Sequence, residues 1–70
     1  MNHVKISQII SDYPAGTKVE LIKMDDNIHP IAPGTKGTVD FVDDTGQIHV
    51  RWENGVGLAL VPEVDEFKKI

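Results

Sequence analysis

The chain has 70 residues and no cysteine, which limits it to one small domain and excludes disulfides, thiolate zinc sites and cysteine nucleophiles. Apolar residues make up 40% and charged residues 26%, as in a soluble globular domain, and no apolar run is long enough for a membrane span or a secretion signal. The formal net charge of −4, with scattered basic residues, disfavours binding to a nucleic-acid backbone, and the lack of cysteine fits a cytoplasmic location.

A helical period runs through residues 3–13. Its apolar positions, spaced as on one helix face, are Ile6, Ile9, Ile10 and Tyr13. Pro14 ends the helix, because a proline disfavours the helical conformation of the residue before it. An isolated helix of this length is marginal in water, so we expect it to pack over an open end of the remaining structure.

From residue 17 onward the period becomes two. Val19 and Leu21 alternate with charged residues and predict a first strand. The following loop, residues 24–33, contains Pro30 and Pro33, each of which removes a backbone donor and so excludes a central strand. A loop of this length in so small a domain is often functional.

Two further strands are predicted, over residues 34–42 and 47–53, with a turn at 43–46. In the first of them, we expect Val39 and Phe41 to share one face and Thr38 and Asp40 to share the other. In the second, alternation directs Ile48, Val50 and Trp52 inward and Gln47, His49 and Arg51 outward.

Asn54-Gly55 is a strong hairpin signal, and both residues tolerate the positive φ of a type I′ turn. It predicts a fourth strand over 56–61, stopped by Pro62, then a turn at 63–66 and a short last strand at 67–70 that closes the sheet. The expected fold is therefore mainly β, a single domain over 1–70, with a helix at 3–13 packed on a five-stranded SH3-like barrel at 17–70.

Nearly the whole chain resembles one known family. The matching stretches, in order and spacing, are YPAGT (13–17), MDD (24–26), PGTKGTV (33–39), VDDTGQIHVRWENG (42–55) and LALVPEVDEF (58–67). They are similar to domain-of-unknown-function family 4314, found in bacteria, phages and mobile elements. Val56-Gly57 and Glu63 depart from its pattern near the last turn. The resemblance implies an SH3-like fold and a bacterial or viral origin, and it implies no function.

Metal and catalytic motifs are weak in this sequence. Asp25, Asn27 and His29 alternate like the start of a calcium loop, but Pro30 and Lys36 occupy the positions that need glycine and glutamate. A weaker cation site involving Asp26 or Asp65 stays open. No serine or threonine lies in a nucleophile motif, and no phosphate loop is present, so we predict that the chain is not an enzyme and uses no cofactor or metal.

The sequence favours a protein partner, leaves a small molecule open, disfavours nucleic acid and predicts no membrane. The expected partner-binding residues are Met24, Asp25, Asp26, His29, His49, Arg51, Trp52, Asn54 and Leu58. Trp52 fits the core better than an exposed rim, and Ile28 and Ile31 could expose apolar surface on the long loop. The main hypothesis is a binding module that docks on, and could inhibit, a host or defence protein. The alternatives are an oligomer that sequesters a small molecule or nucleotide, with Arg51, His49 and Lys36 toward the anion, and a nucleic-acid-binding barrel; the oligomeric state is left open.

Overall fold

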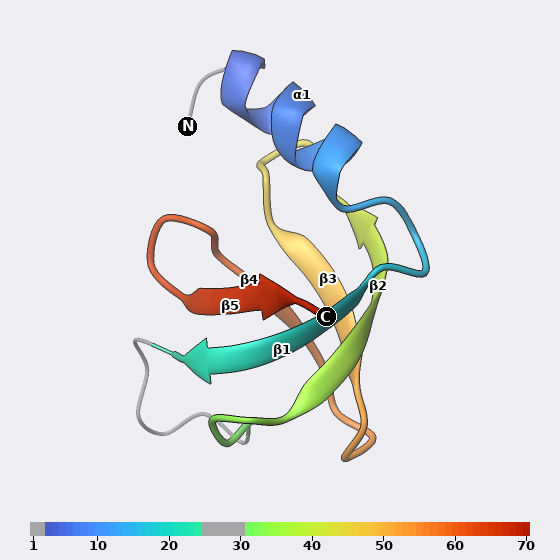
Figure 1. Ribbon diagram of the computed structural model, residues 1–70. Coiled ribbons are helices and arrows are strands. Elements are labelled where there is room, and N and C mark those ends of the chain that lie inside the picture. Colours follow the sequence, from blue (N-terminus) through green and yellow to red (C-terminus); the bar gives the residue numbers. More distant parts are fainter. Residues whose placement is uncertain (1–2, 25–30) are drawn as a thin grey trace.

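The structure is a computed structural model that describes residues 3–24 and 31–70 (Figure 1). The elements are α1 (His3–Asp12), β1 (Lys18–Lys23), β2 (Lys36–Val42), β3 (Ile48–Trp52), β4 (Gly57–Leu60) and β5 (Glu66–Lys69). The strands form one antiparallel sheet in the order β4-β3-β2-β1-β5. The predicted mainly β fold, with five strands and a short N-terminal helix, is confirmed. No helix in the described ranges is long and apolar enough to cross a membrane.

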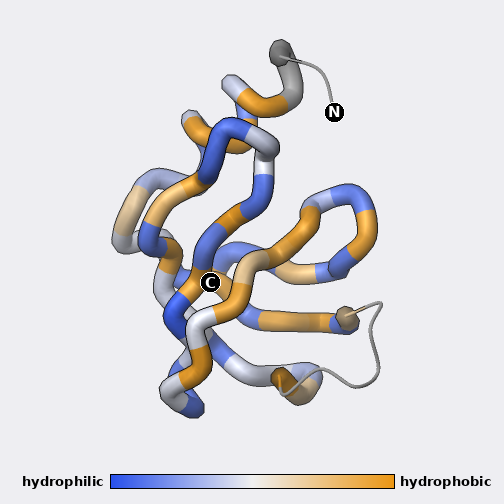
Figure 2. Tube along the Cα trace, turned by 180° about the vertical axis from the view of Figure 1, so that it is seen from behind, coloured by the Kyte–Doolittle hydropathy of each residue, from blue (hydrophilic) through white to orange (hydrophobic). Residues whose placement is uncertain are grey.

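The core lies on one face of the curved sheet. Its buried side chains are Val19, Leu21, Ile31, Val39, Ile48, Val50, Trp52 and Leu60. Hydrophobic and hydrophilic residues alternate along much of the strands (Figure 2), as the period of two predicts. Full burial of each large apolar side chain stabilises the fold by about 1.5–3 kcal/mol. Ile31 is 4% exposed and belongs to this core, so the expectation that it exposes apolar surface is wrong.

Strand β2 contains a β-bulge that sequence alternation does not predict. Val39 pairs with Val50 and Phe41 pairs with His49, so Asp40 is the extra residue on β2. The extra residue reverses the alternation, and Val39 is 1% exposed while Phe41 is 53% exposed. The expectation that Val39 and Phe41 share a face is therefore wrong.

The turn at Asn54-Gly55 forms a hairpin of a different type from the one predicted. Trp52 N donates to Val56 O at 3.0 Å, and Gly55 N donates to Trp52 O at 2.9 Å. Gly55 has a φ of 87°, and among the described residues only glycines have positive φ. A type I′ turn would require positive φ at Asn54 too, so this is a three-residue loop with a left-handed glycine at its end.

Helix α1 lies at the end of the sheet near the β2–β3 turn (Figure 1). Ile9 and Tyr13 pack against the core, whereas Ile10 stays 48% exposed, so the buried face is narrower than the predicted one. Tyr13 contacts Phe67 of β5 edge-on, with 5.6 Å between ring centroids. Lys69 Nζ lies 4.8 Å from the centre of the same ring. The helix therefore contacts β2, and Tyr13, just after its C-terminal end, contacts β5.

The last strand pairs with β1, and β4 pairs with β3 alone. The hydrogen-bonded sheet therefore has two edges, β4 and β5, in place of the closure that we expect from the sequence. The five-strand order is established, while the SH3-like classification of the fold stays a prediction.

Candidate docking surface

A surface hollow lies over each half of the outer face of the sheet. The first lies over β2, β3 and β4, has a volume of about 370 Å³ and is lined by Asp40, Phe41, His49, Val50, Gly57, Leu58 and Ala59. We call it the aromatic hollow. The second lies over β1, β2 and β3, has a volume of about 260 Å³ and is lined by Lys18, Lys36, Gly37, Thr38, Arg51, Glu53 and Ile70. We call it the charged hollow.

The aromatic hollow is built on a stacked pair of rings. Phe41 and His49 are cross-strand partners, with ring centroids 4.3 Å apart and ring planes at 8°. Ala59 of β4 is the partner of His49 on its other side. Cross-strand partners share a face of the sheet, so the two rings and the small Ala59 side chain form one row across three strands.

Asp43 fixes the His49 ring in this row. Its Oδ2 lies 2.8 Å from His49 Nε2, and its Oδ1 accepts hydrogen bonds from Thr45 N, Thr45 Oγ1 and Gln47 N. Hydrogen bonds from the Thr45 hydroxyl and from His49, in that order of size, hold the pKa of Asp43 well below its ordinary value. An ionised carboxylate only accepts, so Nε2 carries the hydrogen of the His49–Asp43 bond.

An ion pair lies at the rim of the aromatic hollow. Arg51 Nε is 2.7 Å from Asp40 Oδ1; the Arg51 side chain is largely exposed and that of Asp40 is partly exposed. Such an exposed pair adds only about 0–1 kcal/mol to stability. It places the Arg51 guanidinium next to Asp40, which lines the aromatic hollow together with Phe41.

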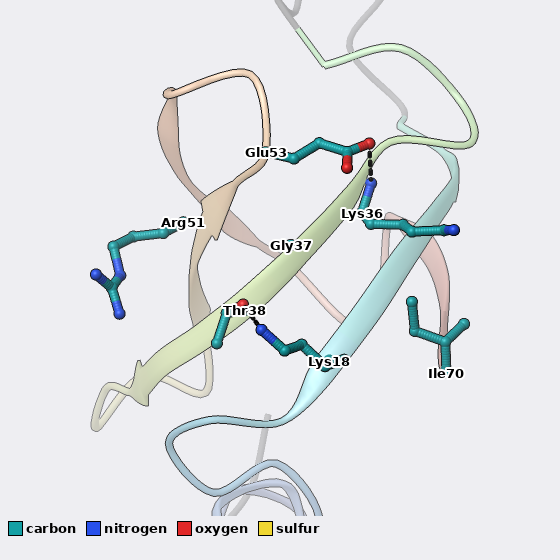
Figure 3. A pocket seen from close by; sticks show the side chains of 7 residues that line it. All are labelled: Lys18, Lys36, Gly37, Thr38, Arg51, Glu53 and Ile70. Atoms are coloured by element: carbon teal, nitrogen blue, oxygen red, sulfur yellow. Dashed lines mark hydrogen bonds between the residues drawn. The ribbon is translucent and has the colours of Figure 1, made fainter.

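The charged hollow does not bring its cations to one point. Arg51 and Lys36 extend to opposite sides of it, and Lys18 lies between them on β1 (Figure 3). Lys18 Nζ donates to Thr38 Oγ1 at 2.7 Å, and Arg51 is paired with Asp40. Glu53 adds a negative group, whose Oε1 accepts a bond from Lys36 N at 3.2 Å. The cations are therefore spread out and partly satisfied within the protein.

Two of the predicted partner-binding residues, His49 and Arg51, reach this outer face. His49 lines the aromatic hollow, and Arg51 lines the charged one and pairs with Asp40, which lines the aromatic one. Leu58 also lines the aromatic hollow, but it is the partner of the core residue Val50 and packs against the core. The predicted outward orientation of His49 and Arg51 is confirmed. The anion-binding alternative groups Lys36 and Arg51 with His49. Lys36 lines only the charged hollow and His49 lines only the aromatic one, so these three residues do not line one hollow.

The other predicted partner-binding residues in the described part of the chain line neither of these two hollows. Trp52 is 3% exposed and its indole N donates to Leu58 O at 3.1 Å, which confirms the core position and contradicts the exposed-rim alternative. Met24 is half-buried against the core. Asn54 is exposed at the β3–β4 turn, where its Oδ1 accepts a bond from Val56 N. Asp25, Asp26 and His29, with Ile28, lie outside the described residues.

Sequence reasoning missed Phe41 and Asp40. A signal was present, since Phe41 and Val42 are adjacent apolar residues and cannot both face the core in a regular strand. Val42 is the one that packs against the core. Within the described residues, no three histidine, aspartate or glutamate side chains gather as a metal site; Asp65 instead accepts a hydrogen bond from Val61 N at 2.8 Å.

These features define a small, mainly β domain with an exposed aromatic pair on the outer face of its sheet. The chain belongs to the family described as Domain of unknown function (DUF4314), which it matches over residues 2–70. This confirms the resemblance noted in the sequence. No curated protein and no solved structure matches the chain.

Proposed function

We propose that this chain is a non-catalytic binding module that docks a protein partner on the aromatic hollow. In keeping with the sequence resemblance, we place it in the cytoplasm of a bacterium or of a host cell invaded by a phage or mobile element. There it would bind, and could inhibit, a host or defence factor. The SH3-like layout of its strands would serve as the scaffold.

The observation that carries this proposal is the outward position of Phe41. The bulge at Asp40 turns the ring away from the core, and stacking on His49 holds it in place. Phe41 is 53% exposed, so covering the rest of its ring gains on the order of 1 kcal/mol, about half of what full burial of a phenylalanine contributes. The adjacent Ala59 and half-buried Leu58 supply apolar surface around it. Aromatic side chains are enriched in protein-binding surfaces.

The alternatives have less support from the geometry. An anion-sequestering oligomer needs converging cations, and those of the charged hollow extend apart. A nucleic-acid-binding surface needs an excess of positive charge, and the positive groups of this face alternate with acidic ones. The cross-strand row Lys68, Glu20 and Lys36 is an example.

The test compares capture of a partner by the immobilised chain and by two serine variants, from lysate of the bacterium that carries the gene. Phe41→Ser removes the proposed anchor. Ile22→Ser is the matched control, because Ile22 of β1 is also a large apolar residue, 46% exposed, away from the hollow. We expect Phe41→Ser to lose the partner and Ile22→Ser to retain it, with thermal unfolding confirming that both fold. Equal capture by wild type and Phe41→Ser would refute the proposal.

A further inference from the structure

The two edges of the sheet differ in charge. Strand β5 has the sequence EFKK, in which three of four residues are charged, whereas β4 has the sequence GLAL and no charge. Charged residues on an edge strand oppose pairing with another chain, and their absence leaves the edge open to it. The uncharged edge is also the one that borders the aromatic hollow.

The outward backbone groups of β4 follow from the hairpin. Trp52 N donates to Val56 O, so the amides of Leu58 and Leu60 face β3 in the antiparallel ladder. By the same alternation, the N–H and C=O groups of Gly57 and Ala59 face away from β3. Further along, Val61 N donates to Asp65 Oδ2, which closes the edge after β4.

Negative charge flanks this open edge at both ends. Glu53 lies in the turn before β4, and Glu63 lies, exposed, in the turn after it. A second copy paired antiparallel along β4 would bring the Glu53 turn of one chain toward the Glu63 turn of the other. Each chain also carries a net charge of −4, so like charges disfavour such a dimer.

We propose that the partner binds as an extended strand that pairs with β4, with uncharged residues at its centre and lysine or arginine at both ends. This inference rests on the proposed function and names the kind of segment recognised. The backbone pairs with Gly57 and Ala59, and the basic ends lie near the acidic turns. A side chain opposite Ala59 points to the same face as His49 and Phe41, so an apolar residue there extends the aromatic row.

The probe is a capped peptide of sequence KKTVTVKK, followed by amide NMR and hydrogen exchange of the whole chain. We expect it to shift the Gly57 and Ala59 amide signals and to slow their exchange about tenfold. The peptide KKTPTPKK keeps the charge but loses backbone donors, and EETVTVEE keeps the backbone but reverses the charge. We expect no effect from the first and about tenfold weaker binding by the second. Equal binding by all three peptides, or shifts confined to residues outside β4, would overturn the inference.

A pair of variants separates this inference from the proposed function. Ala59→Pro removes the outward donor of β4, and Ala59→Ser keeps it. We expect Ala59→Pro to lose the captured partner and Ala59→Ser, which alters only the side chain, to weaken its capture much less. If Ala59→Pro captures the partner while Phe41→Ser does not, the strand-pairing inference fails and the proposed function stands. If Ala59→Pro does not fold, the peptide series on the wild-type chain decides.

Discussion

At the residue scale, Asp43 links a turn to the aromatic hollow. It accepts bonds from Thr45 and Gln47 within the turn and also from His49 on β3. A turn aspartate would ordinarily only shape the local backbone. Here the same carboxylate positions the ring on which Phe41 stacks, so the turn sequence determines the geometry of the aromatic hollow.

The lowered pKa of Asp43 makes stability depend on pH in the acid range. The ionised form is favoured in the fold, so its contribution is present above the ordinary aspartate pKa of about 4 and is lost as pH falls toward the lower folded-state pKa. We expect Asp43→Asn to lower the melting temperature at pH 7, with the difference from wild type shrinking below pH of about 4. Asp44→Asn is the control, because it makes the same charge change one residue away. A difference from wild type that stays constant down to pH of about 2 would contradict this account.

At the scale of the elements, strands β2 and β3 approach closely where Gly37 faces Trp52. A Cβ at position 37 would lie 2.4 Å from Val50 Cγ1 and 2.9 Å from Trp52 Cε3. The missing side chain therefore makes room for the indole ring in the core. Trp52 is 3% exposed, so a larger residue at position 37 would compete with it for space in the core.

We expect Gly37→Ala to destabilise the fold by about 1–3 kcal/mol, because the added methyl group overpacks a buried contact. Gly57→Ala is the matched control, since a Cβ there meets no atom within 4 Å, and its effect should stay within about 0.5 kcal/mol. Urea unfolding measures both. Equal effects of the two substitutions would show that the close approach is not what selects glycine at position 37.

The sequence predicts the buried residues of some strands better than those of others. The alternation in β1 and β3 correctly identifies Val19, Leu21 and Trp52 as core residues, because burial on one face imposes a period of two. The bulge at Asp40 is not predicted, since alternation cannot locate an extra residue without the partner strand. For that reason the sequence correctly predicts that His49 points outward, but it does not predict that Phe41 stacks on it on the same face.

At the scale of the whole molecule, the outer face of the sheet divides into two unlike halves. Over β5, β1 and β2 it carries charges of alternating sign, including an ion pair between Lys68 and Glu20 at 3.9 Å. Over β2, β3 and β4 it carries the Phe41–His49 pair and an uncharged edge strand. Charged surface interacts well with water, whereas exposed aromatic surface gains from a partner. The molecule thus has one side suited to docking and one suited to solvent.

The central claim is that a partner covers the half of the sheet formed by β2, β3 and β4. Hydrogen–deuterium exchange of the chain, alone and saturated with its captured partner, tests this most directly. We predict slower exchange in residues 40–42, 48–50 and 57–60, with β5 and α1 unchanged. Protection concentrated on β5, β1 or α1, with the β4 edge exchanging as in the isolated chain, would contradict the account.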